Sequence, residues 1–434
     1  MKMKTRALWA GWLLGTVFTA LLSTAQSAPQ EDFRRAFESA TPIAQSPKID
    51  GAVLAGLQAR GLSMAPTCSD AVFVRRAYLD VIGTLPEIAE TEAFLADTRA
   101  DKRALLVEHL LARPEFADYW SMKWCDLLRV KAEFPINLWP NAVQYYHRWI
   151  REALRQNMPY DAFARALLSS SGSNFRVPQV NFYRALQGRS PEAIAATVAL
   201  TFMGVRLETW PENQRKAMEA FFSRIAYKKT GEWKEEIVCL DPAPAPAMET
   251  TFPSGDAVTI GPEDDPRAVF AQWLIKADNS WFTANICNRI WTWLMGRGIV
   301  HEPDDFRHDN PPSNPELLRV LQSELLAAQY DLRHLFRLIL NSATYQQSSI
   351  PETDSPEARA LFAFYPVRRL EAEVLLDAIN QLTGGRDRYS SPIPEPFTYI
   401  PETQRAIAVA KDMFKQALSE LQSEAKARPV GFLR

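Results

Sequence analysis

The side chains that could do chemistry are densest at residues 301–309, His-Glu-Pro-Asp-Asp-Phe-Arg-His-Asp. Asp304 and Asp305 supply carboxylates, which suit a hard cation such as calcium, and the imidazole of His301 would widen the choice to zinc or iron. These three residues are therefore the candidate metal ligands. No ligand spacing here is diagnostic, so the sequence favours a structural alternative in which the carboxylates pair with nearby arginines and shape the loop. The arginines within reach are Arg289, Arg297 and Arg307.

A second polar group precedes this segment and comprises Asn288, Arg289 and Arg297. A guanidinium presents five donors in a planar fork, which can hold a carboxylate, sulfate or phosphate. These three residues are the candidate ligand-binding residues. The structural alternative, which the sequence favours, is a buried bridge that ties a helix to the Gly-Arg-Gly turn at 296–298.

Tryptophan is frequent, with twelve in the chain, and four lie outside the clearest apolar stripes. Exposed indoles form flat platforms for sugars or peptides, although they more often fill gaps between helices. The four are Trp139, Trp210, Trp233 and Trp281. The sequence contains no phosphate-binding glycine loop, no Gly-x-Ser-x-Gly and no His-Glu-x-x-His, so it lacks the motifs of several common enzyme classes.

The elements that must hold these residues are predicted to be helices, because apolar residues recur at helical period along most of the chain. Two segments, Thr84–Glu87 and Ser313–Glu316, have the pattern of a capping box, which marks a helix start. Leucines at every fourth position from 317 to 325 predict a helix after the second box. Another helix should start at Asp331 and pack against it as an antiparallel hairpin.

Further apolar stripes predict helices over 116–127 and 143–154. Residues 190–205 are apolar on nearly every face, which predicts a central, fully buried helix. A helix over 367–383 should end at Gly384, because the Gly-Gly pair there is a conventional left-handed stop.

In the segment that starts at residue 75, Arg76 and Asp80 lie four positions apart, which suits an ion pair within one helix. A catalytic role for Asp80 is the less favoured interpretation, because the sequence offers it no partner base or nucleophile.

Five prolines interrupt the helical pattern between Asp241 and Asp265. We interpret residues 241–264 as a Pro-rich linker, with room for one or two short strands around 257–260. The predicted fold is therefore mainly α, with two helical domains over 26–240 and 265–434.

The N-terminus has the parts of a secretory signal peptide: a cationic start, an apolar run from Ala7 to Leu22 and a small-x-small site at 23–25. We predict that residues 1–25 are removed and that the protein is periplasmic or secreted, with an uncleaved anchor as the alternative. No later segment is an uncharged apolar run of membrane length, so we expect no membrane span after cleavage.

The composition bears on the choice of partner and on the state of the cysteines. The 49 basic and 51 acidic residues leave a net charge of -2, which gives no electrostatic reason to expect a nucleic-acid partner. The four cysteines could form two disulfides in an oxidising compartment, or stay as buried thiols, and the sequence leaves both open. They are Cys68, Cys125, Cys239 and Cys287.

Three sets of motifs together resemble a known family. The first is Arg-Arg-Ala-Tyr-Leu-Asp-Val-Ile-Gly-Thr-Leu-Pro at 75–86, and the second is Asp-Pro-Arg at 265–267 with Phe-Ala-Gln-Trp-Leu at 270–274. The third is the stretch 283–318 with Ser-Ala-Thr-Tyr-Gln-Gln-Ser at 342–348. Over about residues 47–400 the chain is similar to paired domains of exported planctomycete and verrucomicrobial proteins, the domains of unknown function fifteen forty-nine and fifteen fifty-three.

The resemblance implies a cytochrome-associated family, because many relatives carry a Cys-x-x-Cys-His-like motif after a buried helix. The corresponding residues here, 202–213, contain no cysteine and no histidine. Covalent haem c needs two thiols and an axial imidazole at fixed spacing, so we expect no covalent haem c in this chain. The tail over 409–434 also departs from relatives and has an amphipathic, helix-like pattern, so the second domain is expected to be divergent or truncated there.

The resulting expectation is a non-catalytic binding or assembly component of a periplasmic or cell-surface system, with an envelope protein or a glycan as its partner. The link to polysaccharides comes from the usual setting of the family. The alternative is a metal-assisted hydrolase in polysaccharide processing that uses Asp304, Asp305 and His301. A third possibility is electron transfer with a non-covalent cofactor.

Overall fold

The computed structural model describes residues 46–132, 140–232 and 234–385, together with Leu138, Ser419 and a few positions between 34 and 43. The predicted signal peptide, Trp139, Trp233 and nearly all of the C-terminal tail lie outside these residues. None of the helices described there combines the length and apolar character that a membrane crossing requires.

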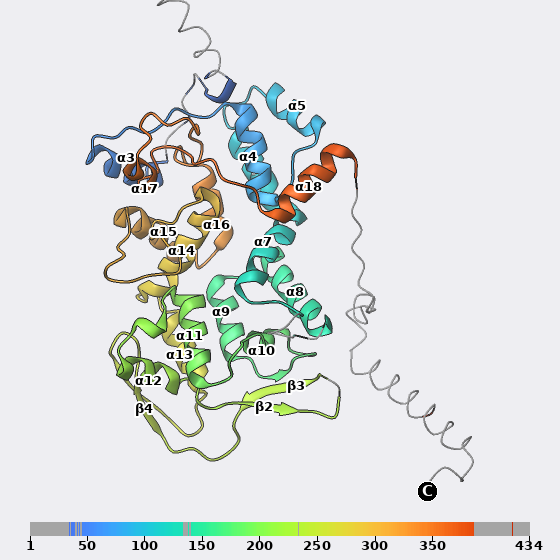
Figure 1. Cartoon of the computed structure of the whole chain (residues 1–434), viewed down its shortest axis with the longest axis vertical. Coiled ribbons are helices and arrows are strands. Elements are labelled where there is room, and N and C mark those ends of the chain that lie inside the picture. Colours follow the sequence, from blue (N-terminus) through green and yellow to red (C-terminus); the bar gives the residue numbers. More distant parts are fainter. Residues whose placement is uncertain are drawn as a thin grey trace, which may run out of the picture.

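The described part of the chain is mainly helical, as predicted (Figure 1). Its first half contains α3 (Ile49–Gln58), α4 (Asp70–Ile82), α5 (Ile88–Ala96), α6 (Lys102–Ala112), α7 (Pro114–Leu127), α8 (Pro140–Arg155), α9 (Tyr160–Ser169), α10 (Asn181–Arg184), α11 (Pro191–Val198) and α12 (Glu212–Ala220). Its second half contains α13 (Pro266–Leu274), α14 (Ser280–Met295), α15 (Pro315–Ala327), α16 (Leu332–Leu340), α17 (Pro356–Ala360) and α18 (Ala372–Thr383).

The strands are short and antiparallel. One sheet has the order β1 (Gly172–Ser173), β3 (Glu236–Leu240) and β2 (Ile225–Lys229), with Tyr227 opposite Val238. A separate hairpin pairs β4 (Met248–Thr251) with β5 (Ala257–Ile260). This hairpin lies within the Pro-rich segment, and β5 confirms the strand predicted around 257–260.

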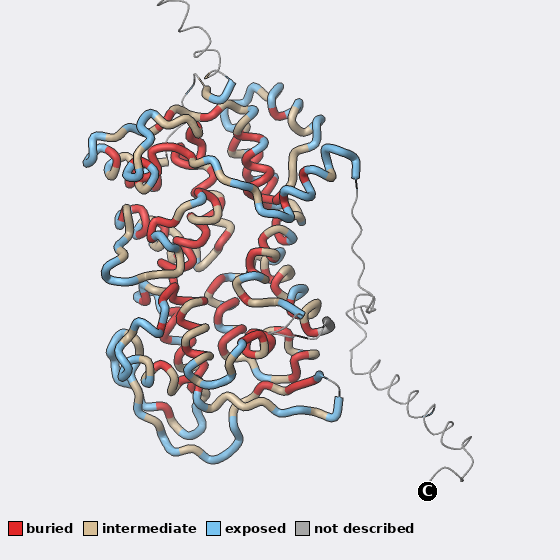
Figure 2. The backbone as a smooth tube through the Cα atoms, viewed as in Figure 1, coloured by how far each residue is buried: buried red, intermediate tan, exposed pale blue. Residues whose placement is uncertain are grey.

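Segments from both halves of the sequence lie together throughout the molecule. In the upper part of Figure 1, α3 to α5 lie near α17 and α18, and in the lower part α9 to α12 lie near α13. The buried side chains form one cluster that runs from Ile49 to Tyr365 (Figure 2). Residues from both predicted domains share this one core, so the division of the chain around 241–264 stays a prediction.

The N-caps of two helices lie one and three residues later in the sequence than predicted. Helix α5 has Glu87 as its N-cap, in a reciprocal capping box with Glu90, and Thr84 does not cap it. Helix α15 has Asn314 as its N-cap, whose side chain accepts a 3.0 Å hydrogen bond from the backbone N of Leu317. The predicted cap Ser313 lies one residue before it. Because Pro315 occupies the first turn, the residue directly before that proline is the one placed to cap.

The start of α18 also differs from the prediction. The helix begins at Ala372, although its end at Thr383 and the left-handed Gly384 (φ 70°) are as predicted. Residues 366–371 are not helical, because Arg368 extends to contact Asp80 and the backbone oxygen of Trp293. The predicted helices over 317–325 and after Asp331 are confirmed as α15 and α16.

The helix predicted over 190–205 is present in two parts, but the prediction that it is fully buried is wrong for the first part, where Glu192 is exposed and only Ile194, Ala195 and Val198 are buried. Helix α11 continues into a π-helical turn, η2 (Ala199–Met203), which ends at Gly204. The turn is almost entirely buried, and Thr201, Phe202 and Met203 are all at most 1% exposed. Its loosened backbone leaves carbonyl groups available to side chains from elsewhere in the chain.

Candidate functional site

Asn288 and Arg289 lie on the buried side of α14 and bind backbone groups. The Asn288 side chain accepts a hydrogen bond from Val300 N at 3.0 Å and donates to Val300 O at 3.0 Å. Arg289 donates to the oxygens of Thr201 and Leu200 in the π-helical turn, the latter at 2.7 Å. Both side chains thus join α14 to neighbouring segments, which is the structural role that the sequence favoured.

The two aspartates of the 301–309 segment have different partners. Asp304 Oδ1 accepts a hydrogen bond from Arg289 Nε at 2.8 Å. Asp305 Oδ1 lies 3.0 Å from Arg307 Nε, at an angle that does not make a hydrogen bond, and 3.9 Å from Arg206. The predicted acid–arginine pairing therefore exists for Arg289 and Arg307.

His301 and Arg297 lie apart from these pairs. The His301 imidazole is 3.6 Å from the neighbouring Glu302 carboxylate and faces solvent. Arg297 is half-buried, and its Nε has no hydrogen-bond partner in the part of the chain that the structure describes. Within those same residues there is no group of three or more His, Cys, Asp or Glu side chains placed to share a metal ion. A metal at Asp304, Asp305 and His301 stays a prediction.

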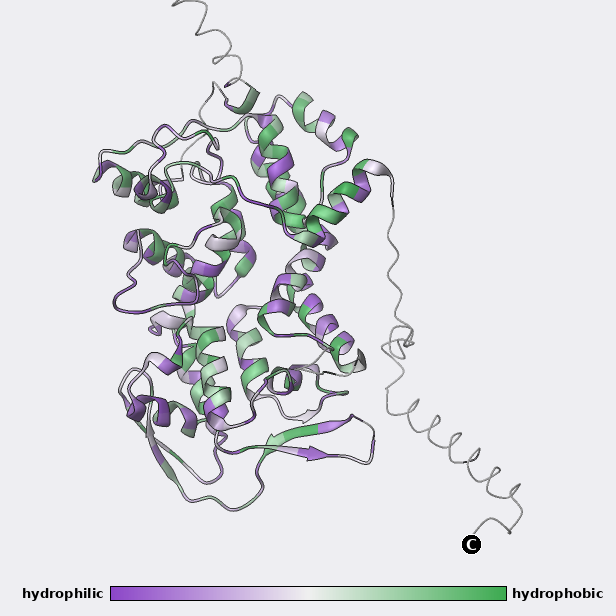
Figure 3. Ribbon diagram, in the orientation of Figure 1, coloured by the Kyte–Doolittle hydropathy of each residue, from purple (hydrophilic) through white to green (hydrophobic). Residues whose placement is uncertain are grey.

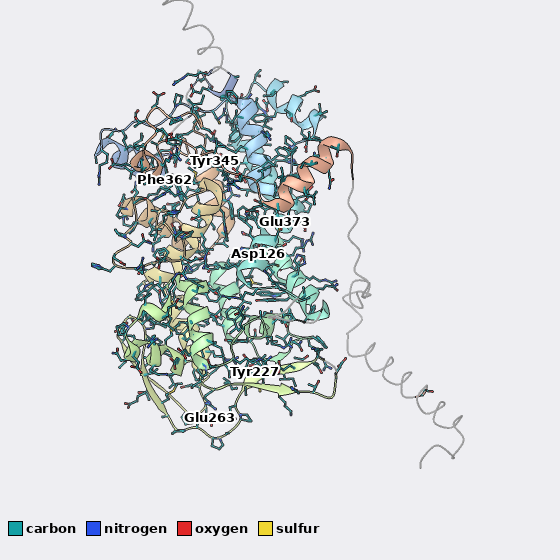
Figure 4. The ribbon with its side chains drawn as sticks, viewed as in Figure 1. Asp126, Tyr227, Glu263, Tyr345, Phe362 and Glu373 are labelled. Atoms are coloured by element: carbon teal, nitrogen blue, oxygen red, sulfur yellow. The ribbon has the colours of Figure 1, made fainter. Side chains whose placement is uncertain are left out.

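The 301–309 segment contributes to two separate pockets. The first, which we term the waist pocket, has a volume of about 330 Å³ and is lined by side chains of α7 and α14, by Pro303 and Asp304, and by Glu371 at the start of α18. Its charged lining residues are Lys123, Asp126, Arg289, Asp304 and Glu371. Figure 4 labels Asp126 in this middle region of the molecule.

The cations of the waist pocket are already paired. Lys123 binds the Glu371 carboxylate, and Arg289 binds Asp304. Burial lowers the pKa of Lys123, an effect that the neighbouring Glu371 opposes. The pocket therefore has a mixed, self-compensated charge and offers no free cation for an anionic ligand among the residues that line it.

The second pocket, which we term the tryptophan pocket, is larger, with a volume of about 490 Å³. Its aromatic walls are Trp210, Trp281 and Phe306. Polar side chains complete the lining, namely Thr209, Gln214, Arg307, His308 and Asp309. Two of the four tryptophans that lay outside the apolar stripes thus meet at one site, although they are 71 positions apart in the sequence.

A close backbone contact lies next to the lining residues Val205 and Phe306 of the tryptophan pocket. Phe306 N donates to Gly204 O at 2.9 Å. A Cβ at Gly204 would come within 2.8 Å of both the Phe306 ring and Asn285 Oδ1, and Gly204 has a φ of 66°. Only glycine meets both conditions without strain, so this residue allows the 305–309 loop to lie against the end of the π-helical turn.

The tryptophan pocket has the features of a site for an uncharged polar ligand. Indole rings give flat apolar surfaces, and Trp210 and Trp281 supply two of them to the lining. Gln214 and His308 are exposed and can donate or accept. Arg307 is neutralised by Asp305 and by Asp309, which is 3.3 Å away.

A third cluster, which we term the buried hub, lies around Asp80 in α4 and was not predicted. Asp80 accepts hydrogen bonds from the hydroxyls of Tyr345 and Tyr365, both at 2.9 Å, and from Arg368. Burial, and after it the charge of Asp80, raises the pKa of both tyrosines above the ordinary value. Figure 4 labels Tyr345 in the upper part of the molecule. The enclosure of Asp80 agrees with a structural role.

The predicted ion pair between Arg76 and Asp80 is wrong. Arg76 forms no ion pair with Asp80 and donates instead to the backbone oxygens of Gln347, at 3.0 Å, and Tyr345. Its guanidinium stacks 3.9 Å from the centre of the Tyr365 ring. Arg76 therefore interacts with backbone oxygens and an aromatic ring from the second half of the chain, and not with Asp80 one helical turn away.

The motif at 342–348 supplies the other contacts of this region. Asp50 Oδ1 accepts from Thr344 N at 2.8 Å, and Asp50 Oδ2 accepts from Ala343 N at 2.9 Å. Arg103 donates to Gln346 Oε1 at 3.0 Å. Asp50 has no exposed surface and Gln346 is 3% exposed. Buried polar groups must be paired, so these bonds fix how the two halves of the chain meet.

Arg267 of the Asp-Pro-Arg motif has a similar structural role. It is 1% exposed, binds both oxygens of Asp265 and donates to Ser170 O at 3.0 Å. It thereby joins the start of α13 to the end of α9. The family-like motifs are thus mostly buried joints, whereas the ligand-accessible side chains lie in the two pockets.

The residues present do not fit covalent haem. Residues 202–213, where the resemblance led us to look for a haem motif, include Val205, Thr209 and Trp210 of the tryptophan pocket. They offer no thiol and no imidazole. All four cysteines of the chain are free, and burial raises the pKa of Cys125 to about 12 and also raises the pKa of Cys287 above its ordinary value. Such thiols are poorly suited to react.

Comparison with known proteins agrees with the motif analysis. Residues 48–227 match the family model described as a protein of unknown function, DUF1549, and residues 266–428 match the one described as a protein of unknown function, DUF1553. The second match includes most of the tail that was expected to diverge, and whether that domain is truncated stays a prediction. No curated protein and no solved structure matches the chain. The chain therefore belongs to the family that pairs these two domains, whose model names, PSCyt2 and PSD1, suggest an association with cytochromes.

Proposed function

We propose that this protein is an exported, non-catalytic binding component of the cell envelope, and that it holds a saccharide in the tryptophan pocket. The observation that carries the proposal is the meeting of Trp210, Trp281 and Phe306 in one open hollow that is also lined by polar side chains. The volume of about 490 Å³ lies within the range of small-ligand sites.

A saccharide matches this lining because each sugar ring has apolar C–H faces and a rim of hydroxyls. The C–H faces can stack on indole and phenyl rings, and the hydroxyls can bind the indole Nε1 groups and the side chains of Gln214 and His308. The pocket carries little net charge beyond the compensated Arg307, so a neutral sugar is favoured over an acidic one.

The lining of the pocket also supports binding without hydrolysis. Glycoside hydrolysis generally needs two carboxyl groups on either side of the scissile bond. Among the described residues that line the tryptophan pocket, Asp309 is the only one with a carboxylate, and it lies 3.3 Å from Arg307. The site therefore has no second acid for that reaction.

The test is calorimetric titration of the purified protein with neutral oligosaccharides, using cellohexaose and laminarihexaose as probes. We expect saturable binding that the Trp210→Ala variant weakens by about tenfold or more, equivalent to ~1.4 kcal/mol. Trp293→Ala is the matched control, because Trp293 is an indole that lines the waist pocket instead. Equal affinity in Trp210→Ala and the unmodified protein would refute the site.

A metal-assisted hydrolase that uses Asp304, Asp305 and His301 is the second candidate, and the observation behind it is that the Asp304 carboxylate lines the waist pocket and is partly exposed. Release of reducing ends from the same oligosaccharides, dependent on added calcium or zinc and lost in Asp304→Asn, would support it against the binding proposal. A haem absorbance band in the purified protein would instead support electron transfer, with His308 as the imidazole that the tryptophan pocket offers.

A further inference from the structure

Helix α18 carries an exposed apolar row that nothing in the described structure covers. Leu375, Ile379 and Leu382 are 47%, 47% and 77% exposed, and Leu376 beside them is 37% exposed. The helix is largely pale blue in Figure 2 and largely green in Figure 3, so it is both exposed and apolar. Only Val374 and Ala378 are buried. An apolar patch of this kind on a helix at the molecular edge marks a site for a partner.

The spacing of the row specifies the shape of the partner. Ala372, Leu375, Ile379 and Leu382 follow a three–four repeat, the seam by which one helix packs along another. The charged residues within α18 are Glu373 and Asp377, both acidic, and they lie four positions apart beside the row. The complementary partner is a helix with the same apolar repeat and basic residues at matching positions.

The sequence that follows α18 has this pattern. Ile407, Ala410, Phe414, Ala417 and Leu421 repeat at three–four spacing in the tail, which lies outside the described residues. Two lysines, at 411 and 415, lie four positions apart beside that row, as the two acids do on α18. The spacing of the apolar residues therefore matches between the two segments, and so does the spacing of these two pairs of opposite charges.

The intervening chain is long enough for the tail to return to α18. Residues 386–404 separate the two segments and contain four prolines, at 392, 394, 396 and 401, which favour extended backbone. At about 3.3 Å per residue, nineteen residues can span far more than the length of a twelve-residue helix, which rises about 1.5 Å per residue.

We propose that residues 405–425 form a helix that packs on the exposed row of α18 in the same molecule, with Lys411 and Lys415 beside Glu373 and Asp377. A second copy of α18 is a poorer occupant, because it would bring like charges together along the seam. The DUF1553 match extends to residue 428, so the occupant belongs to the same domain as α18.

The experiment is amide hydrogen exchange on the full-length chain. If the tail packs on α18, amides over 407–421 exchange at least about tenfold more slowly than in a synthetic peptide of residues 405–425. The double variant Leu375→Asp/Ile379→Asp should abolish this protection. Leu105→Asp is the matched control, because Leu105 is a comparably exposed leucine, 39%, on another helix, α6, and it should leave the tail protected.

A reciprocal variant tests the contact from the other side. Phe414→Asp changes only the tail, so it should deprotect 407–421 while the exchange of α14 and α16 stays the same. Tail amides that exchange at the peptide rate in the unmodified chain would overturn the proposal. Protection that disappears on dilution, together with a dimer in sedimentation analysis, would also overturn it, because the tail would then lie on a second copy.

Discussion

Two aspartate–arginine pairs, Asp80 with Arg368 and Asp304 with Arg289, have the same chemistry and opposite surroundings. The Asp80 side chain is 7% exposed and also receives two tyrosine hydroxyls. The Asp304 side chain is 37% exposed, has Arg289 as its hydrogen-bond donor among the described residues, and lines the waist pocket. Asp80 has its acceptor sites filled by protein, whereas Asp304 keeps part of its capacity for solvent or a ligand.

The difference shows why residue type and spacing alone do not identify a site. Both aspartates belong to motifs that resemble the family signature, yet the buried hub is closed and the waist pocket is open. The carboxylates of Asp80 and Asp304 differ in the number of hydrogen-bond donors that the fold places around them. A carboxylate that is fully hydrogen-bonded and buried supports stability, whereas one on a pocket wall remains available for chemistry.

The largest expected effect is on the buried hub. Asp80→Asn keeps the shape of the side chain but leaves Arg368 without its counter-charge and places an amide N–H donor where a carboxylate oxygen accepts from Arg368 or from the two tyrosines. Removing one partner of a buried pair costs about 3 kcal/mol of unfolding free energy. Urea unfolding followed by circular dichroism measures this loss. A change below about 1 kcal/mol would show that the hub is not the structural joint described above.

A smaller effect is expected from Tyr365→Phe, which removes one donor to Asp80. The loss of one hydrogen bond to a charged group should cost about 1.5–3 kcal/mol at neutral pH. Because the folded-state pKa of Tyr365 lies above its unfolded value, the unfolded state loses its proton first as pH rises above about 10, and the folded protein loses stability there. Urea midpoints at about pH 8 and about pH 10.5 should therefore differ less in Tyr365→Phe than in the unmodified protein. A drop of equal size in both proteins would contradict this role.

The smallest effect is expected from Asp304→Asn. Because the carboxylate is more than a third exposed, its pair with Arg289 is screened by solvent and should contribute about 1 kcal/mol or less. Arg289 keeps its bonds to Thr201 and Leu200, so the packing of α14 should persist. The same urea titration as for Asp80→Asn makes the comparison direct. Equal losses in the two variants would remove the distinction between hub and pocket.

Local patterns predicted the local elements well. The leucine repeat over 317–325 and the apolar face after Asp331 became α15 and α16, and the Gly-Gly pair ended α18. These features depend on neighbours within one or two turns, which the sequence shows directly. The shift of the α15 cap from Ser313 to Asn314 has a long-range component, because Asn314 Nδ2 also donates to Ala52 O at 2.9 Å, 262 positions away.

The features that could not be predicted depend on contacts between residues that lie far apart in the sequence. Arg76 and Asp80 looked like a helix pair, but the partner of Asp80 is Arg368, 288 positions away. Trp210 and Trp281 lie outside the clear apolar stripes of the sequence, and only the fold brings them to one pocket together with Phe306. Periodicity within a helix carries no information about which distant segment will lie against it, so the tryptophan pocket became visible only in the fold.

The bonds from Asp50 and Arg76 to residues 343–347 have a consequence for inheritance. A gene fragment that ended within the Pro-rich segment would encode Asp50 and Arg76, two buried charges, without the partners that residues 343–347 supply. Such a fragment could not be exchanged between proteins as an independent module. The two domains should therefore be duplicated, transferred and lost together, as one unit of selection.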